Sequence, residues 1–490
     1  MRRREMMTGW FARPARRSAV TAGVALLAGA GLTSAQSLSP LLPPIDEQPL
    51  EQIPVLVHVD SGMLSPGLRP MRPHVAPVLM YQTEIAVPGA PWIRLQFDKA
   101  LLSGDELTGD NAFIWLTSVA DGAVQVMTRR DLDHWGNTSA YFNGDRVRVE
   151  LYAYPGAGDV QLQISTVLIG PGGDRTSTSL CGADNRVAST DPRSARVLPI
   201  QCTVFLIDDQ THNFLTAGHC AGGLSVVQFN VPPSTSSGVI VNPPPEDQYP
   251  VDPASIQSQF FGVGQDWSYF GCFANSNTGL TPFQAQGSFY FTANAAPPVI
   301  NQTIRITGYG TDTTPATSNQ TLQTATGPYV ERTGTIIRYA VDTTGGNSGS
   351  AVIDLTTGQC IGIHTNAGCS STGTGSNSGT AIQHTALQAA LANPAGVTAA
   401  PDCDNNGVPD SVDIQQGAPD CNNNGVLDSC EFIIVPGDLT GDNIVDGADL
   451  AVVLAAFGSA EGGAADLNGD GVVDGADISF LLNNWGTPCG

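Results

Sequence analysis

Three residues that lie far apart in the chain have the types that nucleophilic catalysis needs, and they occur in the order His219, Asp266 and Ser348. A serine hydroxyl is barely nucleophilic at neutral pH, so a histidine has to take its proton as a general base. A carboxylate on the other ring nitrogen fixes the tautomer and stabilises the imidazolium. The sequence therefore predicts that these three residues act together as a catalytic triad.

The segments around these residues favour the same interpretation. His219 lies in "LTAGHC", Asp266 opens "DWSYF", and Ser348 lies in "GGNSGS". Glycines before a nucleophilic serine allow a turn in which backbone N–H groups face the developing oxyanion. Such donors contribute about 10²- to 10³-fold each in comparable sites. Gly346 and Ser348 are the predicted oxyanion-hole donors.

Two other aspartates compete with Asp266 for the acidic role. Asp247 and Asp252 also lie between the histidine and the serine. Their segment is rich in proline, which is typical of an exposed loop. Asp266 lies outside this segment and is preferred.

The motifs "LTAGHC" and "GNSGS", in this order, resemble those of the trypsin-like (chymotrypsin-fold) serine peptidases. The resemblance implies a double β-barrel, protein or peptide substrates and no cofactor for catalysis. It also implies a disulfide between Cys202 and Cys220, since the family links a strand to the residue after its histidine. Asn347 replaces the aspartate of trypsin-type zymogens, so activation by a new N-terminal amine is not expected.

The longer string "DTTGGNSGS", followed by "CIGIHTNAG", resembles the bacterial glutamyl-endopeptidase branch of that family. This resemblance implies that Thr343 and His364 hold an acidic side chain of the substrate, because a hydroxyl and an imidazole can both bind a carboxylate. Asp342 predicts the opposite, since it stands where trypsins carry the acid that selects Arg or Lys. Cleavage after Glu or Asp is preferred. Cleavage after Arg or Lys is one alternative, and a non-catalytic, calcium-dependent surface adhesin on a peptidase scaffold is another.

The chain is too long for one core, and its composition favours β-rich domains. It has 490 residues, with 55 Gly, 34 Pro and 13% charged residues, a profile typical of loop-rich extracellular proteins. Alternating apolar residues within 55–175 predict an antiparallel β-sandwich, which would be a propeptide, a chaperone or a binding domain. Its expected inward faces are Ile93, Leu95 and Phe97; Val147, Val149 and Leu151; and Val160, Leu162 and Ile164.

Residues 178–392 are predicted to form the peptidase domain. The strand-like runs "CTVFLI", "RITGYG", "TIIRYAV" and "QCIGIH" indicate a second all-β domain, and "AIQHTALQAALAN" has the spacing of a closing helix. The six cysteines of this segment are expected to form disulfides, because their number is even. The predicted fold class is thus mainly β: an N-terminal β-sandwich, a chymotrypsin-type double β-barrel and a small α-helical calcium-loop module.

The N-terminus predicts export. Residues 1–35 combine a basic start, an apolar run and small residues at the cut, as a signal peptide does. The apolar run is short for a membrane span, so no transmembrane anchor is expected in the mature chain. Residues 36–54 form a Pro-rich linker. The expected location is secreted or at the cell surface, and the net charge of -24 argues against nucleic acid as a partner.

After a linker at 393–401, the acidic tail repeats the spacing of calcium loops. In residues 436–490 two copies lie 28 residues apart, and each runs into an expected apolar helix, "LAVVLAAFG" and "ISFLLNNWG". They resemble a dockerin type I module, which implies structural Ca²⁺ and a cohesin-like or cell-surface partner. The Gly-Ala pairs of the two loops offer no polar side chain for such a partner. The expected ligands are Asp438, Thr440, Asp442, the Ile444 carbonyl, Asp446 and Asp449, and then Asp466, Asn468, Asp470, the Val472 carbonyl, Asp474 and Asp477.

Residues 402–431 contain two further copies, which resemble thrombospondin-type-3 calcium repeats. Several carboxylates that converge on one loop repel one another without a cation, so folding of the tail should depend on calcium. The expected ligands are Asp402, Asp404, Asn406, Asp410 and Asp413, and then Asp420, Asn422, Asn424, Asp428 and Glu431.

Overall fold

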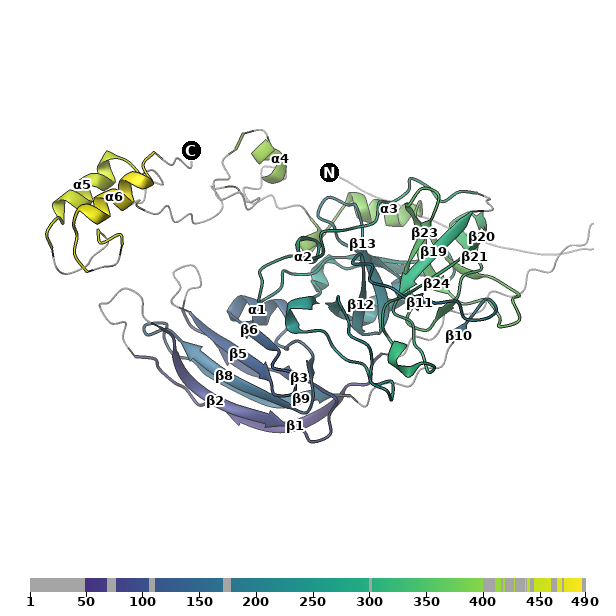
Figure 1. The fold of residues 1–490 in the computed structure, drawn as a ribbon, viewed down its shortest axis with the longest axis horizontal. Coiled ribbons are helices and arrows are strands. Elements are labelled where there is room, and N and C mark those ends of the chain that lie inside the picture. The colour runs from purple at the N-terminus through teal and green to yellow at the C-terminus, as the bar shows by residue number, and fades with distance from the viewer. Residues whose placement is uncertain are drawn as a thin grey trace, which may run out of the picture. The chain divides into compact units, whose positions relative to one another are not determined.

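A computed structural model describes residues 49–67, 76–104, 111–170, 178–298 and 302–399. Within the tail it describes 410–415, 417–418, 427, 437, 439–440, 445–459, 465–468 and 471–486. The predicted signal peptide lies outside these residues. Strands dominate, so the predicted mainly-β class is confirmed (Figure 1). Within the described residues, no helix has the length and apolar character needed to cross a membrane.

The first domain consists of two antiparallel sheets. One has the strand order β1-β9-β3-β7, with β4 added beside β9, and the other has the order β2-β8-β5-β6. The three alternating faces expected from the sequence are all buried in the core. The elements are β1 (Ile53–Asp60), β2 (Val78–Ala86), β3 (Trp92–Gln96), β4 (Lys99–Leu101), β5 (Ala112–Ser118), β6 (Val124–Met127), α1 (Arg129–His134), β7 (Phe142–Asn143), β8 (Arg146–Ala153) and β9 (Gln161–Ile169).

The next sheet has seven strands in the order β16-β15-β12-β13-β14-β18-β17. An isolated bridge between Val251 and Cys272 joins the chain after β16 to the chain after β18. This sheet is the first barrel of the peptidase fold. The elements are β12 (Ser194–Pro199), β13 (Cys202–Leu206), β14 (Phe214–Thr216), the 3-10 turn η1 (Gly218–Gly223), β15 (Leu224–Gln228), η2 (Pro245–Asp247), β16 (Gln248–Pro250), η3 (Pro253–Ser255), β17 (Gln257–Phe260), β18 (Asp266–Phe270) and α2 (Pro282–Gln286).

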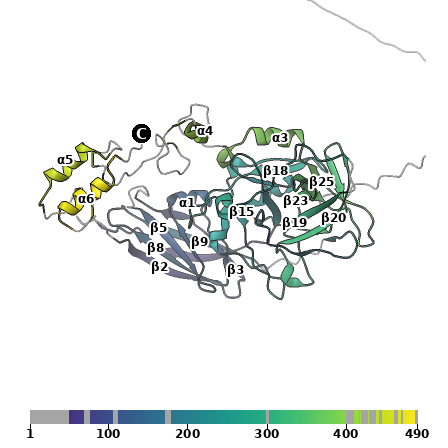
Figure 2. The ribbon, with the colours of Figure 1, turned by 45° about the horizontal axis from the view of Figure 1, so that its top comes forward.

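A second seven-stranded sheet has the order β11-β20-β19-β23-β24-β25-β21, and pairing of β20 with β21 closes it into a barrel. Helix α3 (Thr385–Ala392) follows it, within the segment predicted to be helical. Figure 2 shows α3 beside β18, which α3 also contacts. The elements are β10 (Thr178–Ser179), β11 (Val187–Ala188), β19 (Thr303–Gly308), η4 (Ala316–Ser318), β20 (Gln323–Thr333), β21 (Ile336–Tyr339), β22 (Thr343–Thr344), β23 (Ala351–Asp354), β24 (Cys360–Asn366), β25 (Asn377–Ala381) and η5 (Gly396–Thr398).

The cysteines pair less completely than their even number predicts. The structure contains the Cys202–Cys220 disulfide and a second disulfide between Cys181 and Cys369. Cys272 and Cys360 are instead buried thiols, so the expectation of full pairing was wrong for them. They pack in two separate hydrophobic clusters, and burial raises the pKa of Cys360 to about 12.

The described tail contains the short helix α4 (Asp410–Gln415) and two longer helices, α5 (Gly447–Ala455) and α6 (Gly475–Asn483), which pack against each other (Figures 1 and 2). Asp446 and Asp474 cap these two helices, and each cap is completed by an aspartate three residues later. The helices therefore begin three residues before the apolar runs that predicted them. Most of residues 402–431 lie outside the described part.

Candidate active site

Asp266 and His219 make a two-point contact at the edge of the first barrel. Oδ2 of Asp266 lies 2.7 Å from Nδ1 of His219, and its Oδ1 accepts the backbone N–H of His219 at 3.0 Å. Asp266 is fully buried, and His219 is held in η1, directly after β14. The carboxylate therefore fixes both the ring and the backbone of the histidine.

Thr380 ties this aspartate to the second barrel. The Asp266 N–H donates to Oγ1 of Thr380 at 3.1 Å, and the Thr380 hydroxyl donates to the Asp266 carbonyl at 2.7 Å. Thr380 belongs to β25 and is fully buried. The sequence alone does not reveal this contact, because the two residues are 114 positions apart.

Ser348 lies in the turn between β22 and β23, and a backbone hydrogen bond together with a disulfide brings this turn to the histidine. The Ser348 carbonyl accepts the N–H of Thr203 at 2.9 Å. Thr203 follows Cys202, whose disulfide partner Cys220 follows His219. The disulfide and this hydrogen bond thus bring the histidine and serine segments into one place.

Two glycines are required by the shape of the serine turn. Gly346 has φ +94° and Gly349 has φ +90°, a region that residues with a Cβ rarely adopt. A Cβ on Gly349 would collide with Oγ1 of Thr216 and the carbonyl of Thr203. Within the turn, the Asn347 N–H donates to the backbone carbonyl of Thr344 at 3.0 Å. The glycines noted in the sequence therefore meet a real backbone requirement.

The three predicted specificity residues have different surroundings. Both oxygens of Asp342 accept backbone N–H groups, from Cys181 at 2.6 Å and from Asn185 at 2.8 Å. Thr343 is fully buried, and its Oγ1 accepts a hydrogen bond from Asn377 at 3.0 Å.

His364 on β24 is fully buried, and its Nδ1 lies 2.7 Å from the Tyr339 hydroxyl. Its Nε2 is buried and makes no hydrogen bond with a described residue. Burial, together with the nearby His219, lowers the pKa of His364 to about 3. This imidazole is therefore neutral at physiological pH.

Phenylalanines border the histidine on its exposed side. The Phe260 ring lies 5.7 Å from the His219 ring, edge to face. Phe260 is 48% exposed and Phe261 is 83% exposed. Phe260 thus places a half-exposed aromatic ring beside His219, and its neighbour in sequence, Phe261, is also exposed, features that the sequence motifs do not reveal.

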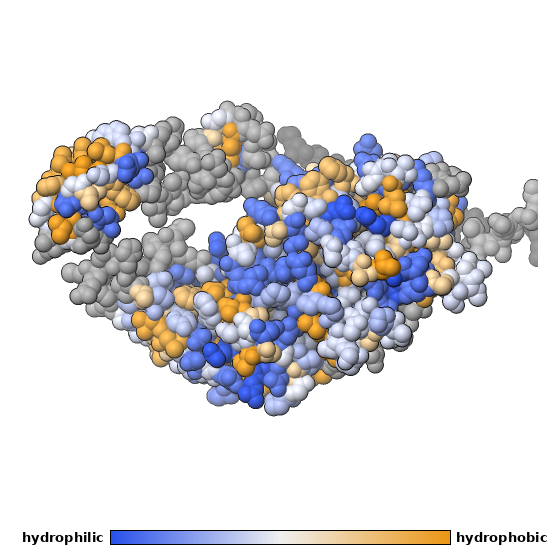
Figure 3. Space-filling model, in the orientation of Figure 1, coloured by the Kyte–Doolittle hydropathy of each residue, from blue (hydrophilic) through white to orange (hydrophobic). Residues whose placement is uncertain are grey.

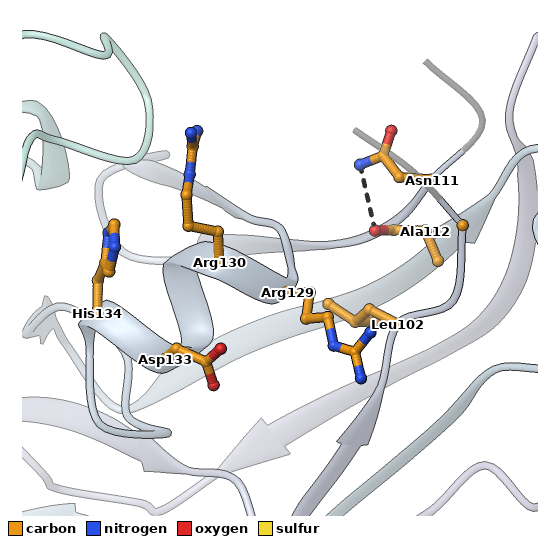
Figure 4. A pocket seen from close by; sticks show the side chains of 8 residues that line it. Leu102, Asn111, Ala112, Arg129, Arg130, Asp133 and His134 are labelled. Carbon is orange, nitrogen blue, oxygen red and sulfur yellow. Dashed lines mark hydrogen bonds between the residues drawn. The ribbon is translucent and has the colours of Figure 1, made fainter. Parts of the chain in front are cut away.

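A cavity of about 380 Å³ lies elsewhere, at α1 of the first domain (Figure 4). Arg129, Arg130, Asp133 and His134 line it from this helix, and the His134 ring stacks on Phe273 at 3.9 Å. It contains none of the predicted site residues. The cavity is therefore distinct from the candidate active site.

The described tail residues include parts of the two predicted dockerin-like loops. Asp449 Oδ1 accepts the N–H groups of Leu439 and Thr440, at 2.7 and 2.9 Å, and its Oδ2 accepts that of Asp446 at 2.8 Å. Asp477 repeats this arrangement with Leu467, Asn468 and Asp474. Asp438, Asp442, Ile444 and Asp470 lie outside the described residues, as do all ligands predicted in 402–431 except Asp410 and Asp413.

Comparison with known proteins agrees with the fold. Residues 202–363 match the model of the trypsin-like peptidase domain, and residues 436–484 match that of the dockerin type I domain. The chain is accordingly of the trypsin-like serine endopeptidase class. It joins a trypsin-like peptidase domain to a dockerin type I domain in one polypeptide. A search of curated proteins gives no match.

Solved structures that resemble this chain include three with peptidase-like folds. A Glu endopeptidase has 23% sequence identity and a TM-score of 0.32. The matched region covers 45% of this chain and 97% of the endopeptidase chain. The protease Anisep from Arthrobacter nicotinovorans has 13% identity and a TM-score of 0.31, covering 42% of this chain and 99% of its own. A mutant of human heparin binding protein has 12% identity and a TM-score of 0.33, covering 43% and 97%.

Proposed function

We propose that the chain hydrolyses peptide bonds through His219, Asp266 and Ser348. The observation that carries this proposal is the buried two-point contact between Asp266 and His219, at 2.7 and 3.0 Å. With Nδ1–H donated to the carboxylate, the neutral ring keeps its Nε2 lone pair for the serine proton. His219 then returns that proton to the leaving amine, while Asp266 stabilises the imidazolium.

The oxyanion would bind at the turn that precedes the nucleophile. Gly346 and Ser348 supply the two backbone N–H groups in this proposal. A residue of β13 fixes this turn, because the Thr203 hydroxyl donates to the Gly346 carbonyl at 2.8 Å. Donors that are fixed before the reaction stabilise the developing charge without any cost of reorganisation.

Labelling with a fluorophosphonate tests the enzyme against the adhesin alternative. The wild type should label and Ser348→Ala should not. Asp266→Asn should retain its fold but lose about 10⁴-fold in kcat, because the wrong histidine tautomer is then favoured. An activated wild type that neither labels nor cleaves a peptide mixture would exclude the peptidase function.

We infer further that the substrate residue before the cut is acidic. The carboxylate of Asp342 is already engaged by two backbone N–H groups, which favours a structural role over selection of Arg or Lys. The buried Nε2 of His364 instead lacks a hydrogen-bond partner among the described residues. A substrate carboxylate would supply one, and the Thr343 hydroxyl offers a second donor.

Tyr339 makes the required histidine tautomer available. Its hydroxyl lies 2.7 Å from Nδ1 of His364 and 3.1 Å from the Ser378 carbonyl. Burial raises the pKa of Tyr339 well above its usual value, so the hydroxyl keeps its proton. A carboxylate bound at Nε2 selects the tautomer protonated there, in which the Tyr339 hydroxyl turns its one proton from the Ser378 carbonyl to Nδ1 of His364.

A cleavage profile of a peptide mixture tests this specificity by mass spectrometry. Wild-type cuts should follow Glu or Asp, and His364→Gln should lower kcat/KM for these cuts by about 10- to 100-fold, as loss of a charge-assisted hydrogen bond does. Cuts after Arg or Lys in the wild type would instead assign specificity to Asp342.

We also propose that the enzyme is exported and held at a surface through its tail. The two disulfides suit an oxidising compartment. Oxygen ligands at the spacing of a calcium loop suit Ca²⁺, which would bring together the carboxylates of each loop. Hydrophobic residues gather on the surface of α5 and α6 (Figure 3), with Leu454, Phe457 and Trp485 exposed. These residues offer an apolar contact to a cohesin-like partner.

A further inference from the structure

The sandwich and the first barrel share a polar interface. Asn143 on β7 pairs twice with the backbone of Asn242: its Oδ1 accepts the N–H at 2.8 Å, and its Nδ2 donates to the carbonyl at 2.9 Å. The backbone of Tyr141 pairs twice with the side chain of Gln248, at 3.0 and 2.9 Å. Apolar residues of the barrel, including Val226, join the sandwich core. This docking is therefore specific in register.

Asn242 and Gln248 both contact Gln228, the side chain that accepts two hydrogen bonds from Arg196. Nε and Nη2 of Arg196 donate to Oε1 of Gln228, at 3.0 and 2.6 Å, and Nη2 also donates to the Val241 carbonyl at 3.1 Å. The side-chain amide of Gln228 donates in turn to Oε1 of Gln248 at 3.2 Å and to Oδ1 of Asn242 at 3.1 Å. The sandwich thus orients the acceptors of a buried guanidinium.

Arg196 depends on these acceptors because it is a cation without any exposure to water. Its hydrogen bonds to described residues go to amide and carbonyl oxygens only. Burial lowers its pKa to about 10, so it stays charged at neutral pH. A buried charge is stable only while its donors are satisfied, so displaced acceptors should make the guanidinium move.

On its other side, Arg196 reaches the wall of the serine turn. Nη1 donates to the Gln320 carbonyl at 3.2 Å, and Nε2 of Gln320 donates to the Tyr309 carbonyl at 2.7 Å. A Cβ on Gly346 would collide with this amide and this carbonyl. Gln320 is fully buried, and its side-chain amide lies against Gly346 of the proposed oxyanion turn.

We propose that the sandwich supports catalysis by the peptidase domain. Its docking positions the oxyanion turn through a chain of contacts that runs from Asn242 and Gln248 to Arg196 and then to Gln320. This inference deepens the proposed function and rests on it. The side chains in this network are positioning residues, since none of them touches the reacting atoms. A sandwich that served only to assist folding, or as a disposable propeptide, would not need this connection.

Two matched asparagines test the proposal. Asn277 crosses the same interface, accepting the Val126 N–H at 2.8 Å and donating to the Val124 carbonyl at 2.7 Å. Among the described residues, it makes no hydrogen bond with Arg196 or Gln228. Asn143→Ala and Asn277→Ala each remove two hydrogen bonds across the interface and one to a carboxylate, that of Asp121 and of Glu246 respectively, so both should weaken docking to a similar extent. The full chain is used for both variants, and their melting temperatures are compared first.

Only Asn143→Ala should disturb the turn. We expect its kcat to fall by about tenfold with little change in KM, a part of the loss that removal of an oxyanion donor causes. Hydrogen exchange of residues 341–352 should be faster than in Asn277→Ala. Equal effects in the two variants, or no effect in Asn143→Ala, would overturn the proposal. If the wild type fails to label with fluorophosphonate, the proposed function fails, while the exchange comparison still decides on the network.

Discussion

At the scale of single residues, the candidate active site contains two histidines with opposite surroundings. The ring of His219 is held by a buried carboxylate, since its Nδ1 lies 2.7 Å from Oδ2 of Asp266. His364 is fully buried, its neighbours include a tyrosine hydroxyl, and burial lowers its pKa to about 3. A neutral imidazole can donate a hydrogen bond without requiring a counter-charge. The same burial has a consequence for stability.

His364 should make the folded peptidase less stable in acid. Its pKa in the folded state lies below that in the unfolded chain, so protons bind the unfolded state first as the pH falls below about 6.5. The penalty should reach about 2 kcal/mol at pH 5 and grow until about pH 3. We predict that His364→Gln, in a Ser348→Ala background that prevents autolysis, loses less stability between pH 7 and 5 than its parent. Urea unfolding at each pH measures this difference, and parallel curves would contradict it.

At the scale of elements, the serine turn is braced by the segment that precedes β11. Nη1 of Arg186 donates to Oγ1 of Thr344 at 2.8 Å, and its Nη2 pairs with Asp312 at 2.5 Å. Burial raises the pKa of Asp312, and the charge of Arg186 opposes that rise. The backbone carbonyl of Thr344 accepts the Asn347 N–H at 3.0 Å. A fixed arginine therefore contacts the region where trypsin-type zymogens rely on a new terminal amine.

We predict that Arg186→Met lowers the free energy of unfolding by about 3 kcal/mol, because it leaves Asp312 buried without its cation. The matched control is Arg146→Met. Arg146 forms an exposed ion pair with Glu84 at 3.6 Å, and its removal should cost less than about 0.5 kcal/mol. Urea unfolding compares the two variants. Equal losses would mean that Arg186 contributes no more than a surface charge.

At the scale of the whole molecule, the acidic tail differs from the two β domains in what stabilises it. The sandwich and the barrels have extensive apolar cores, whereas the described core around α5 and α6 contains few fully buried residues. Asp449 and Asp477 accept backbone N–H groups from both ends of their loops, and these hydrogen bonds lower their pKa values against the effect of burial. Each carboxylate therefore stays charged within its loop.

Calcium should therefore order the tail without affecting the rest. In the full chain, excess chelator should speed hydrogen exchange of α5 and α6, and added Ca²⁺ should slow it. Exchange of α3, in the peptidase domain, serves as the internal control and should not respond. Asp449→Ala together with Asp477→Ala should abolish the response, since both loops lose the carboxylate at position 12. A tail whose exchange ignores calcium in the wild type would refute the assignment.

Local patterns in the sequence were enough to predict the mainly-β class, the buried faces of the sandwich and the helical segment that contains α3. Alternation and helical spacing are properties of neighbouring residues. The triad and the calcium ligands could be proposed for the same reason, because each lies in a short motif. Helix starts in the tail were misjudged by three residues, since the caps at Asp446 and Asp474 lie ahead of the apolar runs.

Only the tertiary structure decided what surrounds these motifs. It left Cys272 and Cys360 unpaired in separate clusters, and it gave the carboxylate of Asp342 two backbone partners. It also brought Thr380 to Asp266, and Gln320 to Gly346. These contacts join residues far apart in the chain, and their side chains carry no local signal of the partner that folding brings to them.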